Sequence, residues 1–166
     1  MVESGDENQT RNYILEKIQL HMPTWSPLKP EDIKATKLSG LSNIAYRVKI
    51  ESEEHKDISP QLLLFRVFKC EIVDFRIENS IFEAMSLEKT GPHCYFQCKE
   101  YRVEEFFISR PISIFEMRVD HFLKGYATKI CDFNHNKIAQ DRVEAIRSRD
   151  RTFFEEMELW SGKLKE

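Results

Sequence analysis

Residues 62–68 read LLLFRVF, an almost unbroken apolar run interrupted by one arginine, Arg66. Apolar character of this kind over seven residues predicts a buried strand with cover on both faces. An ionised side chain inside such a strand is costly unless it meets an anion. We therefore expect a carboxylate of the chain, or an anion from outside, to face Arg66. The alternative is that Arg66 lies on an outward face and extends into water.

The segments on either side of this run predict a small sheet with one main helix. Two alternating segments precede it, and a Ser-Gly turn between them indicates a hairpin. A helix-period apolar stripe follows it and ends at Gly91-Pro92, a sequence typical of a helix stop. The order β-β-β-α-β-β gives an α+β fold with a five-stranded antiparallel sheet. The expected elements are strands at 33–38, 44–50, 61–68, 94–98 and 101–107 and a helix at 72–89.

The two ends of the chain have a different character. Residues 1–9 are polar and predict disorder, and the apolar spacing after them predicts a helix at 12–22, before the connector formed by Pro23, Pro27 and Pro30. After the turn Ser109-Arg110-Pro111 the pattern becomes helical, over 115–133 and again over 141–165. We divide the chain into 1–30, a polar tail, helix and connector; 31–112, the sheet domain; and 113–166, a helical segment.

Composition excludes several classes of function. The net charge of −3 over 166 residues gives no general attraction to nucleic acid, so we expect no nucleic-acid partner. No apolar run approaches the roughly 20 residues of a membrane span. Four cysteines without a Cys-x-x-Cys pair, and a polar N-terminus, predict a cytoplasmic protein with reduced thiols. His93, Cys94 and Cys98 fit no common zinc pattern, so we expect no metal site.

Two features beside Arg66 indicate a phosphate site. The loop Ser39-Gly40-Leu41-Ser42-Asn43 joins two antiparallel strands, and its glycine allows backbone N–H groups to approach phosphates, although an ordinary hairpin turn has the same pattern. Glu78, early in the helix at 72–89, is the natural carboxylate partner for Arg66, unless it is simply a solvated helix charge. A cation on a strand with a carboxylate on the next helix is the arrangement by which protein kinases hold nucleotide phosphates.

Taken in order, these motifs resemble the N-terminal lobe of the choline and ethanolamine kinases, over roughly residues 33–135. The resemblance includes the loop after Leu38, the arginine-bearing strand, the start of the helix and a hinge-like segment. The residues that carry it are Leu38 to Asn43, Leu64 to Phe68, Glu78 to Phe82, Thr90-Gly91-Pro92 and Val103 to Pro111. The ending Ser109-Arg110-Pro111 is more similar to choline kinases than to ethanolamine kinases.

The resemblance implies an ATP site. Arg66 would contact the phosphates, Glu78 would orient Arg66, and the backbone of Glu105 and Phe107 would hold the adenine edge. The loop residues Leu41, Ser42 and Asn43 would also approach the substrate. The implied ATP-binding residues are Ser39, Gly40, Leu41, Ser42, Asn43, Ile44, Ala45, Arg66, Glu78, Glu105, Phe106, Phe107, Ile108, Ser109, Arg110 and Pro111.

The chain also departs from the family pattern. Ser39 replaces the first glycine of the loop, and Asn134 or His135 falls near a family histidine. The catalytic His-Asn-Asp segment is missing, because His135-Asn136 is followed by Lys137, which cannot accept the proton of the substrate hydroxyl. We therefore expect no catalytic residue and no metal ligand in this chain, with the Mg²⁺ ligands in the remaining lobe.

The leading hypothesis is the ATP-binding lobe of a choline kinase, inactive alone, whose complete enzyme would make phosphocholine for phosphatidylcholine synthesis. One alternative is an ethanolamine kinase lobe. Another is a non-catalytic relative that acts as a dimer partner or regulator of a full-length kinase. The tail residues Phe153, Phe154, Met157 and Trp160 would then need a partner to cover them, unless they pack on their own domain.

Overall fold

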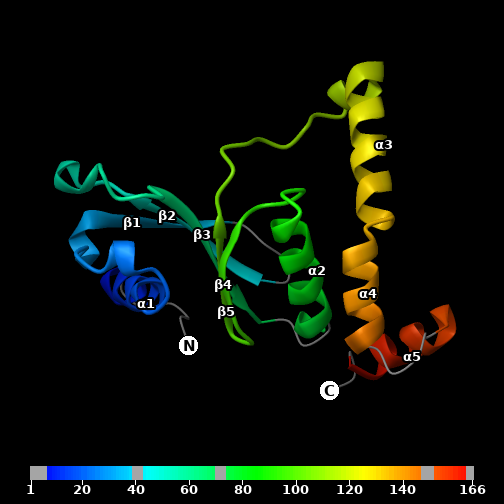
Figure 1. Ribbon diagram of the computed structural model, residues 1–166, viewed down its shortest axis with the longest axis horizontal. Helices are drawn as coiled ribbons and strands as arrows, with labels where there is room; N and C mark the ends of the chain where they lie inside the picture. Colours follow the sequence, from blue (N-terminus) through cyan, green and yellow to red (C-terminus); the bar gives the residue numbers. More distant parts are fainter. Residues whose placement is uncertain (1–6, 39–42, 70–73, 147–151, 164–166) are drawn as a thin grey trace.

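The computed structural model describes residues 7–38, 43–69, 74–146 and 152–163. Five strands form one antiparallel sheet in the order β1-β2-β3-β5-β4 (Figure 1). This confirms the predicted α+β fold and the β-β-β-α-β-β order along the chain. The elements are β1 (Ile33–Leu38), β2 (Asn43–Ile50), β3 (Leu62–Phe68), α2 (Phe75–Leu87), β4 (Cys94–Gln97) and β5 (Tyr101–Glu105).

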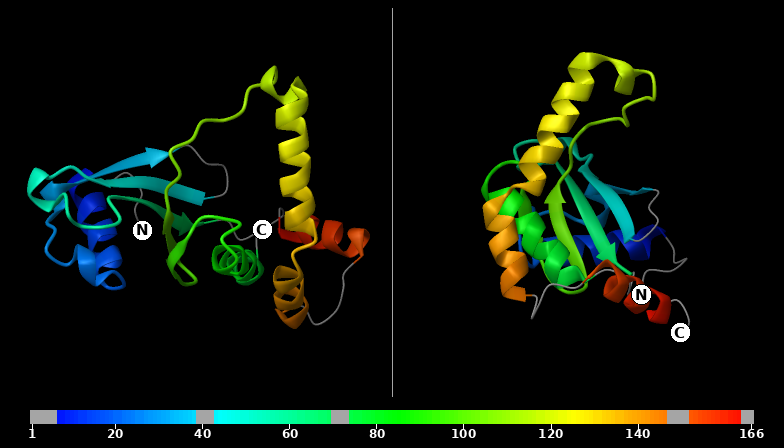
Figure 2. Two further views of the ribbon diagram at one scale, coloured as in Figure 1. Left: turned by 45° about the horizontal axis from the view of Figure 1, so that its top comes forward. Right: turned by 90° about the vertical axis from the view of Figure 1, so that its right-hand side faces the viewer.

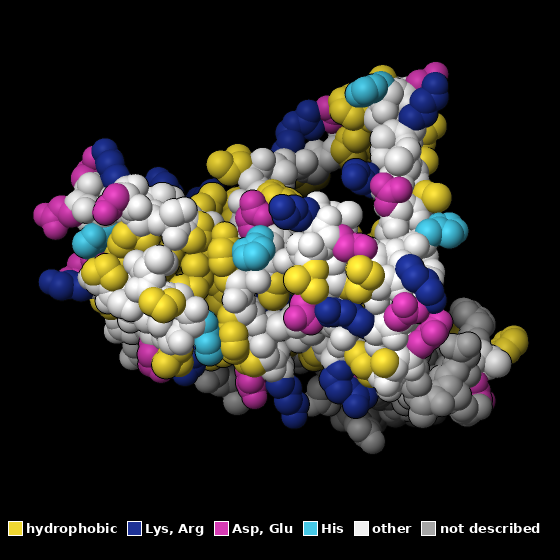
Figure 3. Space-filling view, in the orientation of Figure 1, with side chains coloured by type: hydrophobic (Ala, Val, Ile, Leu, Met, Phe, Trp, Pro, Cys, Tyr) yellow, Lys and Arg dark blue, Asp and Glu magenta, His cyan; other side chains and the backbone are white. Residues whose placement is uncertain are grey.

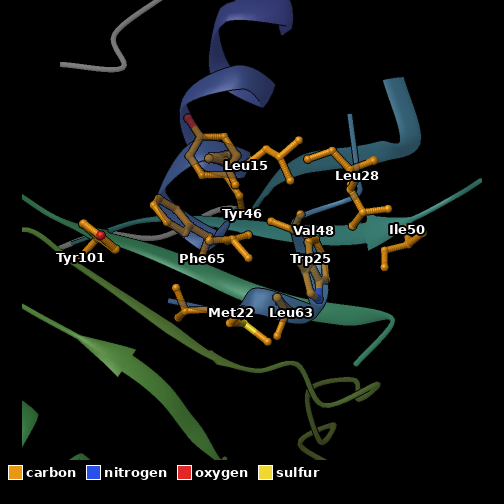
Figure 4. Close-up of a cluster of buried hydrophobic side chains, with 14 residues drawn as sticks. Leu15, Met22, Trp25, Leu28, Tyr46, Val48, Ile50, Leu63, Phe65 and Tyr101 are labelled. Carbon is orange, nitrogen blue, oxygen red and sulfur yellow. The ribbon is translucent and has the colours of Figure 1, made fainter. Parts of the chain in front are cut away.

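Helix α1 (Glu7–Gln19) and two 3-10 turns, Pro23–Trp25 and Pro30–Asp32, cover one face of the sheet (Figures 1 and 4). Apolar spacing along α1 directs three of its side chains into the core, and the first turn adds Trp25. The main buried side chains are Ile14, Leu15, Ile18, Trp25 and Leu28 against Val48, Leu63, Phe65 and Val103.

The helix predicted at 12–22 begins earlier and ends earlier than expected. Glu7 to Gln9 are helical, so the prediction of disorder was wrong for these three residues, and residues 1–6 lie outside the described part of the chain. The acidic Glu7 in the first turn suits the positive end of the helix dipole. The helix stops at Gln19, whose side-chain amide donates to the carbonyls of Trp25 (3.1 Å) and Leu28 (2.8 Å) and so holds the following turn.

The central strand β3 separates two different environments. Leu63 and Phe65 are fully buried under α1, whereas Leu62, Leu64 and Arg66 alternate onto the other face and are only half-buried. The prediction of full cover on both faces was therefore wrong. Helix α2 lies over only part of the second face (Figure 2), and the half-buried side chain of Arg66 belongs to this partly open face.

Three helices follow the sheet: α3 (Asp120–Asn134), α4 (Lys137–Ile146) and α5 (Phe153–Lys163). Helix α3 begins later than predicted because residues 113–118 form a local turn around Glu116, which accepts from the Ser113 amide at 2.8 Å. The stretch predicted at 141–165 contains two helices, α4 and α5, and α4 lies beside α2 in Figures 1 and 2. An ion pair between Arg142 and Glu83 (2.6 Å) joins α4 to α2.

Candidate functional site

Arg66 lies at the centre of the partly open face. Its cross-strand neighbours are Ala45 on β2 and Arg102 on β5. About 28% of its side chain is exposed, and its Nε and Nη2 atoms donate to Oε1 of Glu104 at 3.0 and 2.7 Å. The prediction that a carboxylate faces Arg66 is confirmed, but the carboxylate comes from β5.

Glu104 and Arg102 form a buried ion pair below Arg66. They are 1% and 2% exposed, and Arg102 Nε donates to Glu104 Oε2 at 2.8 Å. Arg102 also donates to Asn79 Oδ1 at 2.9 Å, and its guanidinium lies 3.7 Å from the ring centre of Phe82 on α2. Buried charges need such complete pairing because desolvation would otherwise destabilise the fold. The pair is therefore fixed by hydrogen bonds on both sides and by an aromatic ring.

The predicted direct pair between Arg66 and Glu78 was wrong. The Glu78 carboxylate lies 3.5 Å from Nη2 of Arg102, so that Arg102 and Glu104 stand between Glu78 and Arg66. Sequence analysis missed the two inner residues although a signal was present. In the strand predicted at 101–107, the charges of Arg102 and Glu104 are two residues apart and so share one face, which is the face of Arg66, where opposite charges on neighbouring strands attract.

The predicted phosphate loop is only partly described. Ser39, Gly40, Leu41 and Ser42 lie outside the described residues. Asn43 and Ala45 share the face of Arg66, whereas Ile44 packs against the core on the opposite face. The Asn43 Oδ1 atom is buried and has no hydrogen-bond partner among the described residues. A buried acceptor on the face of Arg66 therefore lacks a donor among the described residues.

The predicted hinge runs along the exposed end of β5. The amide N–H of Glu105 donates to the His93 carbonyl at 2.8 Å, so this N–H is already satisfied within the chain. Phe107 and Ile108 are exposed, and the Ser109 hydroxyl donates to the Phe107 carbonyl at 3.3 Å. Phe106 is half-buried and Pro111 is exposed.

Arg110 closes the end of this segment by binding Glu116. Its Nη1 and Nη2 atoms donate to the two carboxylate oxygens of Glu116 at 2.8 and 2.5 Å. The Arg110 side chain, together with Ser113, holds the pKa of the Glu116 carboxyl well below its usual range. The segment after β5 is thus tied into a defined turn before α3 begins.

His135 and Asn136 act as helix-end residues. The His135 Nδ1 atom is 2.9 Å from the Cys131 carbonyl, and Asn136 Oδ1 accepts from the Ala139 amide at 2.8 Å, which caps α4. In the described part of the chain, no cluster of three or more His, Cys, Asp and Glu side chains could hold a metal ion. None of the helices described is long and apolar enough to cross a bilayer.

Helix α3 presents a broad apolar surface to solvent. Figure 3 shows hydrophobic side chains along this helix at the upper right of the molecule. Five large apolar residues of α3 are between 41% and 55% exposed: Phe122, Leu123, Tyr126, Ile130 and Phe133. Farther along, Phe154 and Met157 of α5 are also exposed, and the side chains of Phe153 and Trp160 lie outside the described residues.

Comparison with known proteins places the chain in a kinase family. Residues 35–166 match the model of the family described as choline/ethanolamine kinase. A human protein described as a choline/ethanolamine kinase is 28% identical over 115 residues, which cover 66% of this chain and 29% of that protein.

Two solved structures are similar in fold. A choline kinase from Cryptosporidium parvum has a TM-score of 0.63 at 20% identity, over 76% of this chain and 36% of that one. An ethanolamine kinase from Plasmodium vivax has a TM-score of 0.52 at 18% identity, over 85% of this chain and 45% of that one. The chain thus spans less than half the length of each of these three relatives. Because the family match extends over most of its residues, the chain belongs to the choline/ethanolamine kinase family.

Proposed function

We propose that this chain forms the ATP-binding half of a choline kinase and that Arg66 binds the nucleotide phosphates. The observation that carries the proposal is a partly exposed guanidinium on the open sheet face, held rigidly by a buried carboxylate. A guanidinium has five N–H donors, and the two bonds to Glu104 do not exhaust them. Phosphate oxygens are the ligands that such a planar fork of donors suits best.

The surroundings of Arg66 suit a nucleotide. Leu64, two residues before Arg66, provides an apolar surface on the same face, on which the adenine ring would lie. The segment from Glu105 to Pro111 runs past the edge of that surface and would supply backbone groups to adenine. Loop residues 39–45 would cover the phosphates and, through residues 41–43, approach the phosphate acceptor.

ATP and Mg²⁺ would supply the phosphoryl group and neutralise its charge. In the described part of the site, the carboxylates of Glu78 and Glu104 both contact Arg102, so we assign no Mg²⁺ ligand to this chain. The general base and the metal ligands would come from polypeptide corresponding to the remainder of the longer relatives. We therefore expect the 166-residue chain to bind ATP weakly and to transfer no phosphate by itself.

Calorimetric titration of the 166-residue chain with ATP tests the proposal. Charge-assisted hydrogen bonds contribute roughly 1.5–3 kcal/mol, so Arg66→Ala should weaken binding by about 10- to 100-fold. Arg118→Ala is the matched control, because Arg118 is an exposed arginine in the 3-10 turn before α3 and does not belong to the sheet. Undetectable ATP binding, or equal affinities for the Arg66 and Arg118 variants, would contradict the proposal.

The choice of choline over ethanolamine rests on the sequence Ser109-Arg110-Pro111. Addition of the missing part of the family fold as a second polypeptide should then restore transfer to choline in preference to ethanolamine. Preference for ethanolamine in that assay would support the ethanolamine kinase alternative.

A second function, as a dimer partner or regulator of a full-length kinase, is favoured by the exposed apolar surface of α3. Several large apolar side chains exposed along one helix are typical of a surface that another polypeptide covers. Sedimentation of the isolated chain at micromolar concentration provides the test. A single well-behaved monomer would argue against self-association through α3, and a concentration-dependent dimer that Leu123→Glu abolishes would support it.

A further inference from the structure

We propose that Glu104 on β5, and not Glu78 on α2, positions Arg66 for nucleotide phosphates. This inference rests on the proposed role of Arg66 in ATP binding. It assigns a positioning residue within the sheet: the carboxylate that contacts the phosphate-binding cation comes from β5, and α2 acts only through Asn79 and Phe82, which hold Arg102. In protein kinases, by contrast, a carboxylate on the helix fixes the strand cation, and movement of that helix controls the site.

Strand geometry places Glu104 beside Arg66. Arg66 lies opposite Arg102 in the β3–β5 ladder, and Glu104 is two residues farther along β5, on the same face. Diagonal neighbours on adjacent strands are within reach of long side chains. One carboxylate oxygen of Glu104 accepts both bonds from Arg66, so the guanidinium is fixed in both position and plane.

The second oxygen of Glu104 fixes the carboxylate itself. It accepts from Arg102 Nε at 2.8 Å, and both residues are almost fully buried. Arg102 is held in turn by Asn79 and by the ring of Phe82. Glu104 and Arg102 are therefore packed inside the lobe, where few rotamers are available.

Glu78 is poorly placed to do the same. Its nearest contact in the network is Arg102 at 3.5 Å, which is long for a charge-assisted hydrogen bond, and 32% of its side chain is exposed to water. It touches Arg102 and has no ion pair with Arg66. Loss of the Glu78 charge should therefore leave the orientation of Arg66 almost unchanged.

The experiment compares ATP with adenosine as ligands of the 166-residue chain. Adenosine lacks phosphates, so general damage to the site weakens both ligands, whereas misplacement of Arg66 weakens ATP alone. We expect Glu104→Gln to weaken ATP binding by roughly tenfold, with adenosine affinity unchanged. Glu78→Gln, the matched control, should change the affinity for either ligand by less than about twofold.

Glu104→Gln leaves Arg102 buried without its carboxylate, and the variant could fail to fold. The double variant Arg102→Met with Glu104→Gln removes the buried cation at the same time and keeps the volume similar. It should show the same selective loss of ATP affinity, with a far-ultraviolet circular dichroism spectrum like that of the unmodified chain.

Three results would overturn the inference. The first is a loss of ATP affinity in Glu78→Gln as large as in the Glu104 variants, which would assign the positioning role to α2. The second is ATP binding that is unchanged or tighter in both Glu104 variants. The third is an equal loss for ATP and adenosine, which would show a structural role alone. If Arg66→Ala leaves ATP affinity unchanged, the proposed function fails instead, and the two failures are thereby distinguished.

Discussion

The lobe should lose much of its stability when Trp25 is replaced by alanine. Trp25 lies in the 3-10 turn after α1, is fully buried, and donates its indole N–H to the Pro60 carbonyl at 3.2 Å (Figure 4). Removal of a buried aromatic side chain costs about 3–5 kcal/mol, and loss of the hydrogen bond adds to that cost. Because small domains are stable by only about 5–15 kcal/mol, a large fraction of the free energy of unfolding depends on this residue.

Urea unfolding followed by circular dichroism measures the effect. With a slope of about 2 kcal/mol per molar urea, a loss of about 4 kcal/mol lowers the midpoint by about 2 M. Leu20→Ala is the matched control, because Leu20 is 64% exposed just after α1 and its loss should change stability by less than about 0.5 kcal/mol. Equal midpoints for the two variants would refute the reasoning that residues 7–28 complete the core opposite Arg66.

Three further predictions concern individual groups. Burial raises the pKa of Cys94 to about 11, so at pH 8 the Cys94 thiol should react with iodoacetamide roughly a hundredfold more slowly than free cysteine. Site-resolved mass spectrometry measures the alkylation rate, and a rate like that of free cysteine would contradict this prediction. Because Arg110 lowers the pKa of Glu116, the contribution of their ion pair is complete above the ordinary value of 4.5 and is lost only as the pH falls through the lowered value. NMR titration of the Glu116 carboxyl carbon should show this, and Arg110→Ala should raise the midpoint toward 4.5, with the Ser113 hydrogen bonds still holding it lower; an unchanged midpoint in that variant would contradict the assignment. Ala139 is buried where α4 begins beside α2, so Ala139→Glu should separate α4 from α2. Hydrogen exchange of the α4 amides should then become faster while the sheet amides stay protected, and unchanged exchange in α4 would contradict the packing of α4 on α2.

The sheet could be predicted well because its signals are local. The bounds of β1 agree with the prediction at 33–38, and the apolar run with Arg66 correctly identified β3. Each segment carries its own apolar alternation and its own turn residues, so the strands can be located without knowledge of distant contacts. The same applies to the stop of α2 before Gly91.

The network around Arg66 depends on contacts that a single segment does not reveal. Strand order places β5 next to β3, although β4 lies between them in the sequence order, and this order brings Glu104 to Arg66. Sequence analysis instead joined Arg66 to Glu78, a carboxylate early in the helix that follows β3 along the chain. Register and pairing across the sheet decided which carboxylate reached the cation.

The first and last residues of the helices also could not be predicted from local sequence signals. The stretch at 141–165 was predicted as one element because its charge pattern is continuous, yet α4 starts at Lys137, where Asn136 supplies a cap. Helix α1 begins earlier than its apolar spacing suggested, because the turns before residue 12 need no buried side chain to be helical.

The most direct test of the account is an NMR titration of the ¹⁵N-labelled 166-residue chain with ATP. The account predicts saturable shifts at the Arg66 side-chain Nε–H and at the backbone amides of Leu64 and Phe107, with none at Ile14 or Trp25 on the opposite face. Absence of any saturable shift, or shifts concentrated on the α1 face, would contradict the claim that this lobe holds nucleotide phosphates on Arg66.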